Sequence, residues 1–195
     1  MSTPVARLSE RLADHTQALI LASAIELLET SSVSELTVRA VAARAGISER
    51  TVFRYFADRD AFLDAVAGAV TERMELPRSP STMEELLRYP DMLYRRFEAV
   101  APLVRAALHT ELFDRLRNAQ AKHRWVAVRA LIDAHAPRRP ERDREIAAAN
   151  IRYHLSASTW HYYRSYFGLS LELTIACGET AVRQAVEGLV AKARR

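Results

Sequence analysis

Four side chains along one short segment have the chemistry to contact DNA. Between Glu49 and Phe56, a helical rotation of about 100° per residue places Arg50, Thr51, Arg54 and Tyr55 on one face. A guanidinium can donate two hydrogen bonds to O6 and N7 of guanine in the major groove. Threonine and tyrosine hydroxyls suit phosphate oxygens. We therefore expect this face to contact a duplex, although a solvated helix with incidental arginines gives the same pattern.

The opposite face of this segment is apolar. Val52, Phe53 and Phe56 cluster there and are expected to anchor the helix to its neighbours. An apolar face inside and a basic face outside are what a helix needs if its side chains are to enter a groove.

The residues around this segment predict the elements that position it. Thr37 is an expected N-cap for a helix over 38–45, and Gly46 follows where a left-handed residue ends a helix. Ser48 is the expected N-cap of the Arg50 helix. Arg59 lies near the start of a further helix that runs to about residue 74, and an amphipathic helix over about 9–29 precedes them all. Two short helices joined by a tight turn with Gly predict a helix-turn-helix.

At these residues a resemblance becomes plain. The stretch LTVRAVAARAGISERTVFRYFADRDAFLDAV, Leu36 to Val66, resembles the N-terminal DNA-binding domain of TetR/AcrR-family transcriptional regulators. The resemblance extends to the apolar ALILASAIELL of the first helix. It implies an all-α fold, with a three-helix helix-turn-helix domain over 1–76 and a helical ligand-binding and dimerisation domain over 77–195.

The resemblance also implies a role for each matched residue. Arg50 and Arg54 correspond to base readers, and the contacts to the DNA backbone correspond to Thr37, Thr51, Tyr55 and Arg59. Ser48 is also among the expected DNA-binding residues. Two departures stand out. Ser31 and Ser32 replace a frequent Gly after the first helix, and Phe53 replaces a frequent Tyr, so that any hydroxyl contact at that position is lost.

The sequence after residue 77 predicts a series of longer helices. They are expected over about 82–100, 102–110, 113–135, 141–167 and 171–194, and in the family the last two form a four-helix bundle with a second copy. The family also places a small-molecule pocket in this half. Side chains at such positions more often belong to the ordinary hydrophobic core than to a pocket. The residues that we expect to line the pocket are Met92, Phe97, Trp125, His154 and Trp160.

Composition excludes several other classes of protein. The longest apolar run without Gly or Pro is five residues, too short for a transmembrane helix, and the first residues lack an apolar signal region, so a cytoplasmic protein is expected. One cysteine cannot form an internal disulfide, and we expect no metal site or cofactor because no ligand cluster, phosphate loop or catalytic motif occurs. The net charge of +4 does not locate a DNA site, because residues 1–74 hold 8 Arg against 10 acidic residues.

The sequence thus predicts a transcriptional regulator and not an enzyme. Its expected partners are a palindromic operator in double-stranded DNA, a second copy of the chain, and a small apolar or aromatic effector that releases a repressor from the operator. An activator is a variant of this interpretation. The alternative from another class is a carrier of small molecules or lipids that keeps the fold without binding DNA, and the outward Arg50 and Arg54 argue against it.

Overall fold

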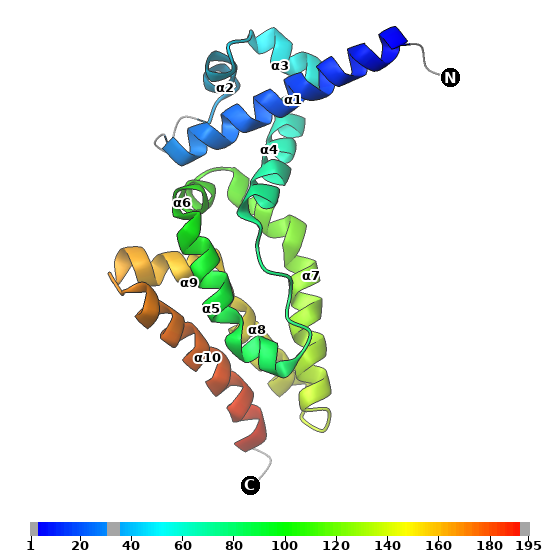
Figure 1. Cartoon of the computed structure of the whole chain (residues 1–195). Helices are drawn as coiled ribbons and strands as arrows, with labels where there is room; N and C mark the ends of the chain where they lie inside the picture. Colours follow the sequence, from blue (N-terminus) through cyan, green and yellow to red (C-terminus); the bar gives the residue numbers. More distant parts are fainter. Residues whose placement is uncertain (1–3, 31–35, 192–195) are drawn as a thin grey trace. The chain divides into compact units, whose positions relative to one another are not determined.

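The computed structural model describes residues 4–30 and 36–191. Over these residues the chain forms helices joined by loops, which confirms the predicted all-α fold (Figure 1). None of these helices is both long and apolar enough to cross a lipid bilayer. The predicted end of the first helix at Ser31 and Ser32 lies outside the described residues. The helices group into two compact units, Met1–Met74 with Pro102–Leu116, and Glu75–Ala101 with Arg117–Arg195.

The first unit contains the predicted helix-turn-helix. Helix α1 (Pro4–Thr30) packs against α2 (Val38–Ala45) and α4 (Arg59–Met74), and α2 packs against α3 (Glu49–Tyr55). The bounds of α2, α3 and α4 agree with the prediction to within one residue. Apolar side chains at helical spacing form the shared core, and they include Ile20, Ala24, Leu28, Val41, Val52, Phe56, Phe62, Leu63 and Val66.

A second segment of chain completes this unit. Residues 102–116 comprise most of α6 (Ala101–His109) and the first residues of α7 (Leu112–His135). Arg115 donates hydrogen bonds to the carboxylates of Asp60 (2.6 Å) and Asp64 in α4. The predicted division of the chain into two domains after residue 76 stays a prediction. The compact units differ from it, because residues 102–116 belong with the N-terminal helices.

The second unit is built around the last helix. Helix α10 (Leu171–Ala191) packs against α5 (Met83–Ala99) and α8 (Glu141–His154), as the ribbon shows (Figure 1). The approach to α5 is close, since Gly178 lies where a side chain would meet Tyr94 and Pro90. Leu86, Leu93, Phe97, Ile132, Ile151, Trp160 and Val182 are among the fully buried side chains of this unit.

The predicted helix over 141–167 is wrong as a single element. It ends at His154, resumes as α9 (Ala157–His161) and continues as one π-helical turn, η2 (Tyr162–Tyr166). The break has a local cause. The Ser156 hydroxyl accepts a hydrogen bond from the Thr159 N–H (3.2 Å), so Ser156 is an N-cap that starts a new helix. Arg152 donates to the Leu155 carbonyl (2.9 Å), which satisfies the end of α8.

Candidate nucleic-acid interface

The turn between α2 and α3 is fixed by caps on both sides. The Thr37 hydroxyl accepts from the Ala40 N–H (3.1 Å), and the Ser48 hydroxyl accepts from the Thr51 N–H (3.1 Å). Between them Gly46 has φ +68°, a left-handed conformation that glycine adopts cheaply. The Ile47 N–H donates back to the Ala42 carbonyl (3.0 Å). These contacts set the direction in which α3 leaves the turn.

The buried face of α3 contains Val52 and Phe56. Val52 is fully buried, and the Phe56 ring meets Phe62 of α4 edge-on, with centroids 5.5 Å apart. The expectation that Phe53 joins this face is wrong, because its side chain is 44% exposed. Val52 and Phe56 are four residues apart and define the inward direction, and Phe53 lies about 100° away from Val52. The outer surface of α3 therefore carries an exposed aromatic ring as well as arginines.

The outward face of α3 places Arg54 against Tyr55. The guanidinium carbon of Arg54 lies 5.2 Å from the centre of the Tyr55 ring, and Arg54 Nη2 is 3.5 Å from the hydroxyl. Hydrogen bonds with Thr16 of α1 and then with Arg54 lower the pKa of Tyr55. Arg50 is also exposed. Both arginines thus present unburied guanidiniums, and one of them is stacked on an aromatic side chain.

Hydroxyl groups border these arginines. The side-chain oxygens of Thr51 and Ser48 are 2.9 Å apart and share one hydrogen bond. Each hydroxyl keeps further capacity for a phosphate oxygen. Thr37 is exposed at the start of α2. The predicted DNA contacts therefore lie at the start of α2, along α3 and at the start of α4.

Arg59 has a partner that the sequence does not indicate. Its guanidinium donates to both carboxylate oxygens of Glu111, through Nη1 at 2.6 Å and through Nη2. This pairing raises the pKa of Arg59. Both residues belong to the first unit. A bidentate Arg–carboxylate pair is directional, so a phosphate that binds Arg59 has to compete with Glu111.

The sequence does not indicate the positions of two side chains near this surface. Phe53 is exposed beside the arginines, where an aromatic ring can contact a thymine methyl group. Thr16 supports the Tyr55 hydroxyl from α1. The four-residue spacing of Val52 and Phe56 is a signal that could have placed Phe53 outward. No local pattern pairs Thr16 with a residue 39 positions away.

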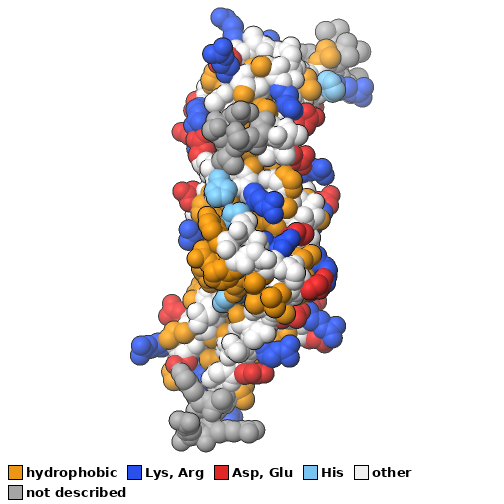
Figure 2. All heavy atoms as spheres, turned by 90° about the vertical axis from the view of Figure 1, so that its left-hand side faces the viewer, with side chains coloured by type: hydrophobic (Ala, Val, Ile, Leu, Met, Phe, Trp, Pro, Cys, Tyr) orange, Lys and Arg blue, Asp and Glu red, His pale blue; other side chains and the backbone are white. Residues whose placement is uncertain are grey.

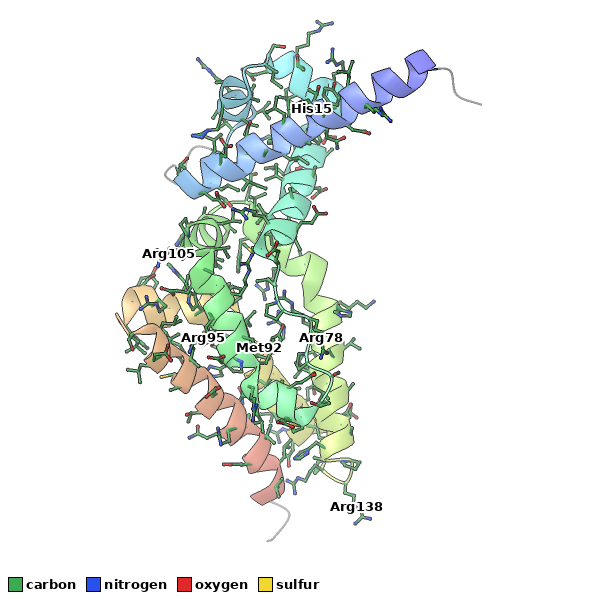
Figure 3. All side chains as sticks on the ribbon, in the orientation of Figure 1. His15, Arg78, Met92, Arg95, Arg105 and Arg138 are labelled. Carbon is green, nitrogen blue, oxygen red and sulfur yellow. The ribbon has the colours of Figure 1, made fainter. Side chains whose placement is uncertain are left out.

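The five predicted ligand-binding residues lie in different surroundings. Phe97 and Trp160 are fully buried with ring centroids 5.8 Å apart, and the Trp160 indole N–H donates to Glu98 (3.2 Å). Met92 is 53% exposed on α5, where Figure 3 labels it. Trp125 and His154 are half-buried. The structure thus brings Phe97 and Trp160 together and leaves Met92 at the surface.

His154 has an unusual ring nitrogen. Its Nδ1 is buried and has no hydrogen-bond partner among the described residues, and burial lowers the pKa of the imidazole. The neutral ring therefore predominates at neutral pH and offers a donor or an acceptor to a bound molecule.

Comparison with known proteins bears on the first unit. Residues 20–66 match the family described as bacterial regulatory proteins, tetR family. A solved TetR transcriptional regulator from Rhodococcus sp. RHA1 shares 18% identity with this chain, covering 91% of this chain and 98% of its own, with a TM-score of 0.44. No curated protein matches the chain.

Proposed function

We propose that the chain is a TetR-family regulator, because residues 20–66 match that family, and that it acts as a homodimeric repressor whose operator binding is released by a small effector. The observation that carries the proposal is α3, with its buried Val52 and its exposed Arg50 and Arg54 at the end of a capped turn. Two such helices enter successive major grooves about 34–36 Å apart.

The proposed roles within α3 differ by chemistry. Arg50 and Arg54 read guanine edges, and Thr51, Tyr55, Ser48 and Thr37 hold phosphates. Arg59 adds a phosphate contact when its guanidinium is released from the ion pair with Glu111. Because base contacts specify and phosphate contacts position, changes at the two kinds of residue have separable effects on sequence preference.

The proposed dimer uses α8, α10 and the corner between them. Figure 2 shows hydrophobic side chains gathered on the face that carries α9 and the start of α10. Exposed rings supply part of this surface, with Tyr162 and Tyr166 centroids 5.1 Å apart and Tyr162 and Phe167 centroids 4.9 Å apart. The exposed apolar residues of the long helices are Ile146, Tyr153, Leu173 and Val190. Exposed apolar side chains gathered on one face favour a protein–protein contact.

The proposed effector is apolar or aromatic and binds within the second unit. We place Trp125 and His154 at its site because both are half-buried, and His154 offers an unpaired nitrogen. Phe97 and Trp160 form a packed wall of the site. Effector binding shifts the population toward a conformer whose recognition helices no longer match the operator, and only its differential affinity for the two conformers drives release.

Selection of random DNA by the purified protein tests the proposal. We expect an enriched palindrome with half-sites about one helical turn apart. Arg50→Ala and Arg54→Ala should each cost about 1–3 kcal/mol of binding and relax preference at one position per half-site. Tyr55→Phe should weaken binding similarly on every sequence, and Arg142→Ala, at an exposed position in the second unit, is the control. No enrichment by the wild type would favour the carrier. Unchanged preference in both arginine variants would reject them as base readers.

A further inference from the structure

Phe53 places an apolar ring among the polar side chains of α3. Its side chain is 44% exposed, although the preceding residue, Val52, is fully buried. A single exposed apolar side chain is ordinary on a protein surface. This ring, however, lies on the helix whose outward side chains include Arg50 and Arg54, both exposed. A molecule that binds the two arginines therefore also meets an apolar group.

The outward side chains of α3 have a fixed order around the helix axis. Burial of Val52 and Phe56 defines the inward direction. At about 100° per residue, Arg50 lies about 60° from Phe53 and one turn before it. Tyr55 lies about 160° from Phe53, at the opposite edge of the outward surface. The ring therefore borders the arginines on one side, and hydroxyl groups border them on the other.

The hydroxyl edge has the chemistry of a contact with phosphates. Thr51 and Tyr55 supply the hydroxyl groups, and both are half-buried. The Arg54 guanidinium carbon lies 5.2 Å from the centre of the Tyr55 ring, so this guanidinium lies toward the hydroxyl edge. Arg50 is the arginine that shares the other edge with Phe53.

The edge that carries Phe53 is unsuited to a phosphate. A phenyl ring has no hydrogen-bond donor, and Glu49 is exposed one turn before Phe53 on the same side of α3. The negative charge of Glu49 repels phosphates. This edge therefore fits an apolar group better than the DNA backbone. In the major groove of DNA that apolar group is the C5-methyl of thymine.

We propose that Phe53 contacts the C5-methyl group of a thymine in each half-site, within two base pairs of the guanine bound by Arg50. Side chains one helical turn apart are displaced by about 5.4 Å along the helix, and base pairs are about 3.4 Å apart, which sets this separation. The proposal rests on the proposed function and names part of the operator. It makes Phe53 a specificity-determining residue beside the two arginines.

The contact also makes binding sensitive to methylation of cytosine. Thymine and 5-methylcytosine carry the same methyl group at C5, and they differ at position 4, where thymine accepts a hydrogen bond and cytosine donates one. A phenyl ring senses the methyl group and not the group at position 4. At the position that Phe53 contacts, 5-methylcytosine should therefore bind more tightly than cytosine.

The experiment compares thymine with uracil, which lacks only the C5-methyl group. DNA selection by the purified full-length protein first supplies the operator, in which we expect a preferred thymine within two base pairs of a preferred guanine. Deoxyuridine then replaces each thymine in turn in both half-sites, and fluorescence anisotropy at fixed salt measures binding. Burial of one methyl group corresponds to about fourfold in affinity, so its loss in both half-sites should weaken binding by about 15-fold.

Variants assign the effect to the ring. Phe53→Ala should bind the thymine and deoxyuridine operators equally, and it should bind the cytosine and 5-methylcytosine operators equally. Val126→Ala, which shortens an apolar side chain of α7 that is 56% exposed, should keep both wild-type differences. Phe53→Gln removes the ring with a residue that favours a helix, so it takes the place of Phe53→Ala if that variant does not fold.

The outcomes separate Phe53 from the repressor itself. Equal affinity of the wild type for thymine and deoxyuridine at every position would overturn the role of Phe53 and leave the repressor intact. A methyl effect that persists in Phe53→Ala and Phe53→Gln would also overturn it, because another side chain then contacts the methyl group. Failure to select any operator would reject the repressor, and the role of Phe53 with it.

Discussion

The guanidinium of Arg59 stands between a carboxylate that is present and a phosphate that is proposed. Glu111 accepts from both of its Nη atoms. A phosphate that approaches Arg59 displaces this carboxylate or is repelled by it. The Arg59–Glu111 ion pair therefore opposes phosphate binding as long as it stays intact. Glu111 is the residue whose charge causes this opposition.

We expect Glu111→Gln to tighten operator binding. Removing one negative charge near the phosphates and freeing Arg59 should gain about 0.2–1 kcal/mol, or up to about fivefold in affinity at low salt, and less at high salt. Fluorescence anisotropy with labelled operator measures this. Glu84→Gln removes the acid of an exposed pair with Arg88 and should have no effect. Weaker binding by Glu111→Gln would mean that Glu111 orients Arg59 for the phosphate.

Residues differ in how far the sequence reveals them. The caps at Thr37 and Ser48 and the exposure of Arg50 and Arg54 follow from local spacing, because each depends on neighbours within one or two turns. The partner of Arg59 is 52 residues away, and that of Arg115 at Asp60 is 55 residues away. Only tertiary structure brings such pairs together, so the sequence suggests a free phosphate contact where the structure has an ion pair.

The secondary-structure elements also differ in how well the sequence predicts them. The apolar pattern of 141–167 continues through Leu155 and Trp160, and so it predicts one long helix. Ser156 followed three residues later by Thr159 is a local capping signal, and the Thr159 hydroxyl also donates to the Tyr153 carbonyl (2.7 Å). Periodicity reports which face is buried, and the caps report where a helix starts. In this segment the capping contacts at Ser156 end one helix and start another, although the apolar periodicity continues.

The contact between α10 and α5 yields a prediction for Gly178→Ala. The new Cβ would lie 2.8 Å from Tyr94 Cε2 and 3.1 Å from Pro90 Cβ. Tyr94 cannot easily retreat, because it is buried and its hydroxyl donates to the His154 carbonyl. We expect a loss of about 1–3 kcal/mol of unfolding free energy, measured by thermal or urea unfolding.

Gly68→Ala in α4 is the matched control. Its Cβ would meet nothing within 4 Å, so replacing a glycine inside a helix should stabilise the protein by about 0.5–1 kcal/mol. Equal changes in the free energy of unfolding for the two substitutions would show that helix propensity alone determines the effect. They would also show that α10 and α5 are not closely packed at Gly178.

At the scale of the whole molecule, the exposed rings predict a dimer. Sedimentation at micromolar concentration should give roughly 44 kDa for a chain of 22.0 kDa. Tyr166→Arg places a charge on a side chain that is 67% exposed within the ring cluster and should shift the protein toward monomers. Val126→Arg changes an apolar side chain of α7 that is 56% exposed and should leave the dimer intact. A wild-type monomer that still binds one half-site tightly would refute the proposed four-helix bundle between two copies of the chain.

The proposed effector can release the protein from its operator only if binding of the two is thermodynamically linked, and the two tryptophans offer a way to measure this linkage. Trp125 and Trp160 are the only tryptophans of the chain, and both belong to the second unit, so we expect their emission to report binding of the proposed effector there. A hundredfold loss of operator affinity requires about 2.7 kcal/mol of differential effector binding, within the usual range of allosteric coupling. Thermodynamic linkage then requires operator DNA to weaken effector binding by the same hundredfold. Titration of the effector with and without saturating operator measures this, with a scrambled duplex as the control. A compound that binds equally tightly in both titrations is not the inducer, however well it fits the second unit.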